Sequence, residues 1–423
     1  MNQKFDVIVI GAGISGLSTA MHVKEENPDL SIVVLDKQHT YGQGNTGKSA
    51  AGYRDIFKTE VNRKLASSSI EFFKSIQKSK GFDIGMHSSG YLFLVRDQSP
   101  MDLMLNDLSR ITKIESVDKD EIRDSLNISY DLDPEQSKLM NLQGYDKGYL
   151  GKNCGIIEPE LVADYYYKEC VRRGIQFNFG VTVSGLSLVP VNPLDYPGEP
   201  FIWQDKKIGS IGTNKGTYQA DEYIMAADVY TTGLLDKTGI DGHERPKKRQ
   251  VFQITNEKIR SMLTREIHTN EGIMPFTILP SHGVFLRPAP KFHSMWIGVA
   301  DDLARDFSFS EDPQAEHDFY ENSIYQILTA YSGNFENAEL TGSWAGYYSY
   351  NTADMTPNIF REVNLTVISG TSGSGIMKGD AIGRVASAVY SGKDKVKLYN
   401  NIEFNVADVG VNHRNVKMEQ LIL

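Results

Sequence analysis

The chain has few cysteines and no long apolar run. Cys154 and Cys170 are the only thiols among 423 residues, too few for a disulfide framework, and reduced core thiols are typical of cytoplasmic proteins. No stretch approaches the ~20 apolar residues that a membrane-spanning helix needs. A secretory signal is also absent, because Met1 to Lys4 leads directly into a glycine-interrupted apolar segment. We therefore expect a cytoplasmic protein without a transmembrane segment.

The chain also has no excess of basic residues. Lys and Arg number 44 against 54 Asp and Glu, which gives a net charge of −10. An acidic average surface disfavours nucleic acid and anionic membranes as partners. The nine histidines are scattered without metal-ligand spacing, so we expect no metal site. The hydrophobic content of 40% and the length favour two or three packed domains around a large core.

The N-terminal segment has the pattern of a dinucleotide-binding unit. An apolar run precedes Gly11, Gly13 and Gly16, and a second apolar run ends at Asp36. Gly11 permits a tight strand-to-helix turn, Gly13 lets a diphosphate approach the backbone, and Gly16 allows close helix packing. Asp36 can accept hydrogen bonds from ribose hydroxyls, which disfavours NADP. A plain glycine-rich turn without a ligand is the alternative.

Hydrophobic periodicity and capping residues predict further elements. Val61, Leu65, Phe72 and Ile76 fall on one face of a helix, and Ser99 before Pro100 favours a helix start. We expect a β-meander over residues 186–224, strands within 246–300 and a helix over 312–331. The chain is thus predicted to mix strands and helices throughout.

Several segments, in order, resemble the D-amino-acid oxidase-like (DAO) family of FAD-dependent oxidoreductases. This family includes sarcosine oxidase, glycine oxidase and the archaeal dye-linked L-proline dehydrogenases, of which the first and last are the most similar. The segments are VIVIGAGISGLS, TGKSAAGYRDIF, residues 174–186, DEYIMAAD, WAGYYSYNTADMTPNI and SGTSGSGIMKGDAIG. The resemblance implies an α/β (α+β) fold in which a Rossmann-like FAD-binding domain is interleaved with a mixed-sheet substrate domain.

The domain boundaries follow from the order of these segments. We expect the FAD-binding domain to comprise residues 1–60, 150–230 and 340–395, and the substrate domain to comprise 61–149 and 231–339. A C-terminal tail, 396–423, has alternating apolar residues. It resembles the tail of the archaeal L-proline dehydrogenases and is expected to dock, over the active site or elsewhere, or to stay disordered.

The resemblance implies FAD, and it implies noncovalent binding because no cysteine follows Cys170 where sarcosine oxidase has its flavin tether. Val183 would contact the adenine, and the helix after Gly373 and Gly375 would face the flavin pyrimidine. A second nucleotide site at this last turn is the alternative. Asp228 stands where the family has glycine, which puts one FAD contact in doubt. The implied FAD-binding residues are Gly11, Gly13, Ile14, Ser15, Gly16, Asp36, Lys37, Gly47, Lys48, Ser49, Ala51, Gly52, Val183, Ala227, Gly346, Gly373, Gly375, Ile376 and Lys378.

The resemblance implies oxidation of a small amino acid or secondary amine, L-proline-like first, by hydride transfer to flavin N5. A substrate carboxylate needs a cation and a hydroxyl donor. Arg54, Tyr348 and Lys378 are the candidates for orienting the substrate. Trp296 stands near the position where sarcosine oxidase has an oxygen-activating lysine, which favours a quinone, dye or protein acceptor over oxygen.

The sequence leaves two other functions open. It also leaves open whether the chain forms a homo-oligomer. The same fold could act on a 2-hydroxy acid or glycerol phosphate with histidine as the base, and His282 and His293 keep that reading open. A non-catalytic FAD-binding assembly protein is the second alternative, which the altered Asp228 favours.

Overall fold

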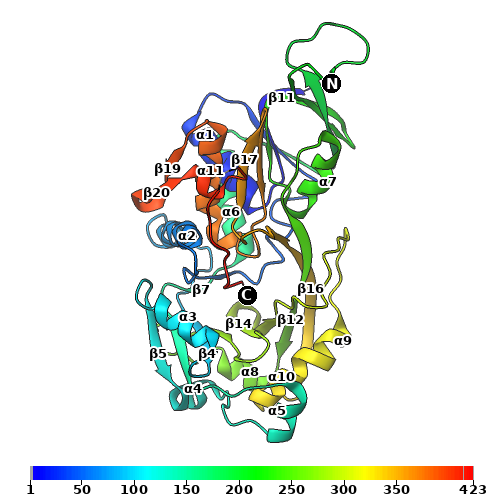
Figure 1. The fold of residues 1–423 in the computed structure, drawn as a ribbon. Helices are drawn as coiled ribbons and strands as arrows, with labels where there is room; N and C mark the ends of the chain where they lie inside the picture. The colour runs from blue at the N-terminus through cyan, green and yellow to red at the C-terminus, as the bar shows by residue number, and fades with distance from the viewer. Residues whose placement is uncertain (1–2, 413, 423) are drawn as a thin grey trace.

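The computed structural model describes residues 3–412 and 414–422. Two eight-stranded sheets organise the chain, and each lies in its own lobe of an elongated molecule (Figure 1). The predicted α/β fold with mixed sheets is confirmed. Within the described residues, no helix combines the length and apolarity that crossing a membrane requires.

The first sheet is largely parallel and contains the N-terminal unit. β1 (Gln3–Ile10) pairs in parallel with β2 (Ile32–Asp36) and with β11 (Gly216–Met225). The carboxyl ends of these strands therefore meet at one edge, where open α/β sheets bind ligands. The remaining strands are β8 (Gln176–Phe179), β9 (Val183–Pro190), β10 (Lys206–Thr213), β17 (Asn358–Glu362) and β18 (Leu365–Ser369).

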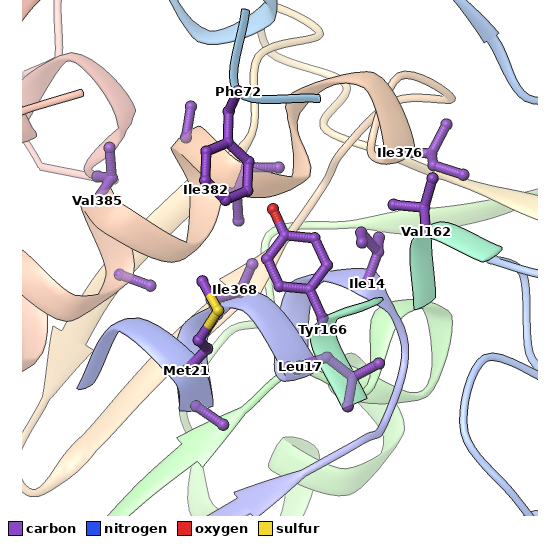
Figure 2. Close-up of a cluster of buried hydrophobic side chains, with 14 of the residues drawn as sticks. Ile14, Leu17, Met21, Phe72, Val162, Tyr166, Ile368, Ile376, Ile382 and Val385 are labelled. Carbon is purple, nitrogen blue, oxygen red and sulfur yellow. The ribbon is translucent and has the colours of Figure 1, made fainter. Parts of the chain in front are cut away.

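Four helices pack together beside the first sheet. They are α1 (Ile14–Glu26), α2 (Glu60–Lys78), α6 (Pro159–Arg172) and α11 (Gly379–Tyr390). Ile14, Leu17 and Met21 of α1 recur at helical spacing and are buried against Tyr166 and Ile382 (Figure 2). This core holds the start of α1 and the start of α11 in fixed positions beside the edge where β1 and β11 end.

The second sheet has the order β16-β12-β15-β14-β13-β4-β6-β5. Its pairs are antiparallel except β13 with β4. The strands are β4 (Tyr91–Val95), β5 (Ile114–Asp118), β6 (Lys147–Gly151), β12 (Arg245–Thr255), β13 (Phe276–Ile278), β14 (Phe285–Ala289), β15 (Ser294–Gly298) and β16 (Glu339–Tyr350). One face packs on a second apolar cluster that includes Phe252, Leu286 and Tyr331.

Shorter elements complete the fold. Ser99 accepts a hydrogen bond from the Asp102 amide, so the predicted cap of α3 (Pro100–Leu108) is confirmed. The helix expected over 312–331 begins at His317 and contains a π-helical turn, Tyr320–Ile324. The others are α4 (Lys119–Leu126), α5 (Pro134–Met140), α7 (Thr231–Leu235), α8 (Glu257–Met262), α9 (His317–Phe319), α10 (Tyr325–Tyr331), β3 (Gly52–Tyr53), β7 (Gly155–Ile156), β19 (Lys395–Lys397) and β20 (Glu403–Asn405).

The expected boundary at residue 340 would place β16 in the FAD-binding domain. It pairs with β12 from Arg245 to Thr255 and so belongs to the second sheet. Only the segment after β16 joins the first sheet, through β17 and β18. The division into domains otherwise stays a prediction.

Candidate active site

The turn from β1 into α1 is closely packed against the end of β11. Gly11 has φ +108°, and a Cβ there would lie 2.3 Å from the carbonyl oxygen of Ala226. Only glycine fits such a position. Gly13 is the N-cap of α1 and has no side-chain cap. A Cβ added at Gly13 would meet only the Thr46 hydroxyl, at 3.2 Å. A ligand can therefore approach the backbone beside the positive end of the helix dipole.

Asp36, at the end of β2, holds this turn in place. One carboxylate oxygen accepts from the amide of Ala12 at 2.7 Å, and the other accepts from the amide of Gln38 at 2.8 Å. A carboxylate oxygen has more than one lone pair, so Asp36 can still accept hydrogen bonds from a ribose.

A cavity of about 880 Å³ extends from this turn to the second sheet. Its volume lies within the range of about 300–1,000 Å³ that is typical of ligand and cofactor sites. Sequence-predicted residues from both ends of the chain form its wall: Gly11, Gly13, Ile14, Ser15, Asp36, Lys37, Lys48, Ser49, Ala51, Gly52, Arg54, Val183, Ala227, Gly346, Tyr348, Gly373, Gly375 and Ile376.

Arg54 is a buried cation at the wall of this cavity. Its side chain lies over the Phe57 ring at 4.2 Å and donates to the carbonyl oxygens of Ile56 and Leu421. In residues 3–412 and 414–422, no carboxylate lies within 4.0 Å of its guanidinium. Buried charges are normally paired, so the cavity end near Arg54 suits an anionic group.

Tyr348 lies close to Arg249 and within electrostatic reach of Arg54. Its ring covers Gly373, where a Cβ would come within 2.3 Å of the ring carbon Cε2. Burial raises the pKa of its phenol, whereas the charges of Arg249 and Arg54 act to lower it. The Arg249 guanidinium lies 5.2 Å from the centre of the ring. Arg54, Tyr348 and Arg249 therefore approach one end of the cavity.

Comparisons with known proteins identify the cofactor that this cavity accommodates. The family model for FAD-dependent oxidoreductases (DAO) matches residues 6–389. The chain belongs to this family.

Individual relatives agree with the family match. FAD-dependent oxidoreductase domain-containing protein 1 of Xenopus laevis is 23% identical, over 95% of this chain and 82% of its own. The crystal structure of L-proline dehydrogenase from P. horikoshii has a TM-score of 0.73 at 20% identity, over 94% of this chain and 96% of that one. Glycine oxidase from Geobacillus kaustophilus has a TM-score of 0.72 at 14% identity, over 98% and 100%. These structures share the fold.

The cavity of this FAD-dependent oxidoreductase fits its cofactor. The open backbone at Gly13 and the start of α1 can accommodate the diphosphate. Asp36 can bind the ribose, and Val183 lies at the wall near the end of β2. The 3-10 turn Ile376–Lys378, which follows Gly373 and Gly375 and leads into α11, faces the same cavity through Ile376. Lys48 also lines the cavity and adds a cation on this wall.

Three predicted FAD or substrate residues do not line the cavity of this oxidoreductase. A Cβ at Gly16 would lie 2.0 Å from the Gly11 carbonyl oxygen, and one at Gly47 would lie 2.6 Å from that of Gly42, so both glycines serve backbone packing. Lys378 is buried beneath the wall, where its ammonium donates to Asn62 Oδ1 and Ser374 Oγ, each at 2.6 Å. Its neighbour Met377 reaches the cavity instead.

Arg249, Glu244 and Asp228 line the cavity but were not among the predicted site residues. Asp228 was recognised only as a departure from the family glycine, and its φ of +52° is the left-handed conformation that glycine would adopt freely. Glu244 directly precedes β12 and Arg249 lies within that strand, and no local motif distinguishes them. Tyr91 and Phe276, stacked at 4.1 Å, form an apolar part of the wall.

Other sequence candidates lie away from the cavity. Trp296 donates through Nε1 to Gln253 at 3.0 Å and packs edge-on against Trp344, so it gives no information about the electron acceptor. His282 contacts the Met140 carbonyl oxygen on an exposed surface, and neither it nor His293 lines the cavity. The histidine base considered for a hydroxy acid is therefore not at the site.

The C-terminal tail docks beside the site. Glu419 accepts hydrogen bonds from the amides of Lys58 and Thr59, at 2.8 and 3.0 Å. The Leu421 carbonyl oxygen accepts from Arg54 at 2.6 Å, and Ile422 reaches the cavity wall. The tail thus extends into the region between the two lobes (Figure 1).

The buried lysine predicts a pH-dependent stability. Burial lowers the pKa of Lys378 from 10.5 to about 7. Between these values the unfolded chain binds the proton and the folded chain does not. The free energy of unfolding should therefore rise with pH from 7 to 10, by up to about 1.4 kcal/mol per pH unit. Lys378→Met should remove this rise in urea unfolding of the apoprotein.

The matched control is Lys237→Met on the exposed surface, which should keep the wild-type slope. An equally steep rise in Lys378→Met would show that other groups cause it.

Proposed function

We propose that this oxidoreductase oxidises a small amino acid or secondary amine, with L-proline-like substrates first, and passes the electrons to an acceptor other than oxygen. The observation that carries the proposal is Arg54, a buried guanidinium at the cavity wall whose polar contacts are carbonyl oxygens. A substrate carboxylate would place a counter-charge against this guanidinium and could bind its fork of donors.

The structural neighbours support the same substrate class. The two solved structures described above are named as an L-proline dehydrogenase and a glycine oxidase, and both names specify small amino acids. The dehydrogenase name agrees with an acceptor other than oxygen, whereas the oxidase name does not.

The residues of the chain would position the substrate for oxidation. Arg54 would hold the carboxylate, and the Tyr348 phenol, kept neutral because burial raises its pKa, would offer a hydroxyl donor. Tyr91 and Phe276 would exclude water from the reacting carbon. Bound FAD supplies the hydride acceptor, flavin N5, and the neutral amine nitrogen contributes its lone pair to the C=N bond of the iminium product.

The first test removes the charge of Arg54. Wild-type holoenzyme should be bleached anaerobically by L-proline or a related amino acid, and should reduce an artificial dye. Arg54→Met should lower kcat/KM by about 30-fold or more, because a desolvated charge partner contributes about 2–5 kcal/mol. Its FAD content should stay unchanged. Arg110→Met, on the exposed surface, should match the wild type.

Two results would contradict this proposal. Unchanged kcat/KM in Arg54→Met would show that Arg54 does not bind the substrate. Rapid stoichiometric hydrogen peroxide formation in air would refute the proposed acceptor.

We also propose that FAD is held noncovalently. Cys154 is buried within 4.0 Å of Asp55, and Cys170 contacts the Leu17 carbonyl oxygen at 3.4 Å. Neither cysteine is part of the cavity wall. Precipitation of the holoprotein with acid should therefore release the yellow colour into the supernatant. A yellow pellet after washing would show a covalent bond.

A further inference from the structure

The C-terminal tail is anchored by contacts that do not use the Glu419 side chain. Arg414 forms an ion pair with Asp354, from Nε to Oδ2 at 2.7 Å. It also donates to the carbonyl oxygens of Pro357 and Gly410, at 3.1 and 3.2 Å. Further along the tail, the Glu419 amide donates to the Asp354 carbonyl oxygen at 2.9 Å. These bonds bring the backbone at Glu419 to its place.

The Glu419 carboxylate is 2% exposed and is surrounded by donors. One oxygen accepts from the amides of Lys58 and Leu421, at 2.8 and 3.1 Å. The other accepts from the Thr59 amide and hydroxyl, at 3.0 and 2.8 Å, and from Asn62 Nδ2 at 3.3 Å. A carboxylate can accept at both oxygens, whereas an amide can accept at only one end. The site is therefore specific for a carboxylate.

Glu419 sets the orientation of the Asn62 amide. Asn62 Nδ2 also lies 2.9 and 3.3 Å from the hydroxyls of Thr59 and Thr356, but a hydroxyl can donate or accept and suits either orientation. The carboxylate suits only one, because it cannot donate. Asn62 Nδ2 therefore faces Glu419, and Asn62 Oδ1 is left to accept from Lys378 Nζ at 2.6 Å.

Lys378 connects this amide to the wall of the cofactor cavity. Its Nζ also donates to Ser374 Oγ at 2.6 Å. Ser374 lies in the turn that supplies Gly373, Ser374 and Gly375 to the wall. The side chains of Asn62 and Lys378 are fully buried, so water does not replace a lost hydrogen bond. A change in the Asn62 amide would therefore reach this turn through Lys378.

The tail also brings a negative charge to two buried cations. Lys378 Nζ and the Arg54 guanidinium lie over the same Phe57 ring, at 4.5 and 4.2 Å from its centre. Burial lowers the pKa of both groups, and the charge of Glu419 acts against that lowering. The carboxylate thus favours the charged forms of both side chains.

We propose that Glu419 is a positioning residue of the FAD site: the docked tail fixes the Asn62 amide, and Asn62 holds Lys378 against the Ser374 turn. In the expected binding mode this turn faces the flavin pyrimidine, where hydrogen-bonding groups tune the electronic properties of the ring. The inference depends on FAD as the cofactor and not on the identity of the substrate.

The first test is Glu419→Gln, which keeps the size of the side chain. Either orientation of the new amide turns its NH₂ group toward backbone donors, so the hydrogen bonds of the carboxylate are lost. The variant should still fold, because the contacts of Arg414 remain. Its Kd for FAD, from the fluorescence of free FAD over reconstituted apoprotein, should rise about tenfold or more. The visible absorption band of bound FAD should shift as well.

The matched control is Glu403→Gln, an exposed carboxylate in β20, which should keep the wild-type Kd and spectrum. Asn62→Ala interrupts the hydrogen-bond chain without altering the tail, so it should reproduce both effects of Glu419→Gln.

A double-mutant cycle tests whether Glu419 acts through Lys378. Lys378→Met alone should also raise the Kd for FAD and shift the absorption band. The combined variant should bind FAD no more weakly than the weaker of the two single variants, because both changes break one chain of hydrogen bonds. If the tail only stabilised the fold, the two fold-changes in Kd would multiply.

Wild-type Kd and spectrum in Glu419→Gln would overturn the proposal, and so would multiplying effects in the combined variant. The absorption spectrum requires no release of FAD, so it tests the role of Glu419 whether or not the flavin is covalent. Flavin that stays attached after acid treatment would refute only the proposed noncovalent binding.

Discussion

The structure depends on one close approach, between the turn after β1 and the end of β11. A Cβ at Gly11 would lie 2.3 Å from the Ala226 carbonyl oxygen, and one at Gly16 would lie 2.0 Å from the Gly11 carbonyl oxygen. Both distances are far below van der Waals contact, so any side chain would separate the two strands or displace α1. This contact places the start of α1 at the sheet edge, with the Gly13 backbone toward the cavity.

The cofactor cavity then gathers groups from distant parts of the sequence. β16 brings Tyr348 from the second sheet to Gly373 near the start of α11, and the tail brings Leu421 to Arg54. Several ionisable groups at or beneath the cavity wall are buried. The cost of burying each charge is offset in a different way. Arg54 has carbonyl oxygens, Lys378 has neutral acceptors and a lowered pKa, and Asp228 and Glu244 have raised pKa values. Such a wall is suited to a ligand that carries charge of its own.

The features that the sequence predicts well are local. Gly11, Gly13 and Asp36 form a motif whose spacing specifies a strand, a turn, a helix and a second strand, and the structure has each of them. Arg54 was placed at the wall because it directly follows a recognisable flavin loop. Gly16 and Gly47 were assigned to FAD, yet glycine serves backbone packing as readily as ligand contact, and sequence alone does not separate the two.

The remaining features depend on contacts between distant residues. Whether Lys378 or Met377 reaches the cavity depends on one residue of register in a short 3-10 turn, Ile376–Lys378. Trp296 faces Gln253 because β15 pairs with β12, a pairing that no local pattern specifies. The approach of Arg249 to Tyr348 likewise requires β12 to pair with β16, about 100 residues later in the chain.

The most direct test of the account concerns the diphosphate at Gly13. A Cβ there would meet only the Thr46 hydroxyl, at 3.2 Å, and that hydroxyl accepts a hydrogen bond from the Ile14 amide at 3.0 Å. Gly13→Ala should therefore still fold as apoprotein, with a small loss in Tm, while its methyl group occupies the expected diphosphate position. The account predicts a Kd for FAD raised at least about tenfold (about 1.4 kcal/mol), whereas Gly44→Ala, at a cavity glycine with no atom within 4 Å, should bind FAD normally. Wild-type affinity in Gly13→Ala, or a wild-type protein that is colourless and binds no FAD, would contradict it.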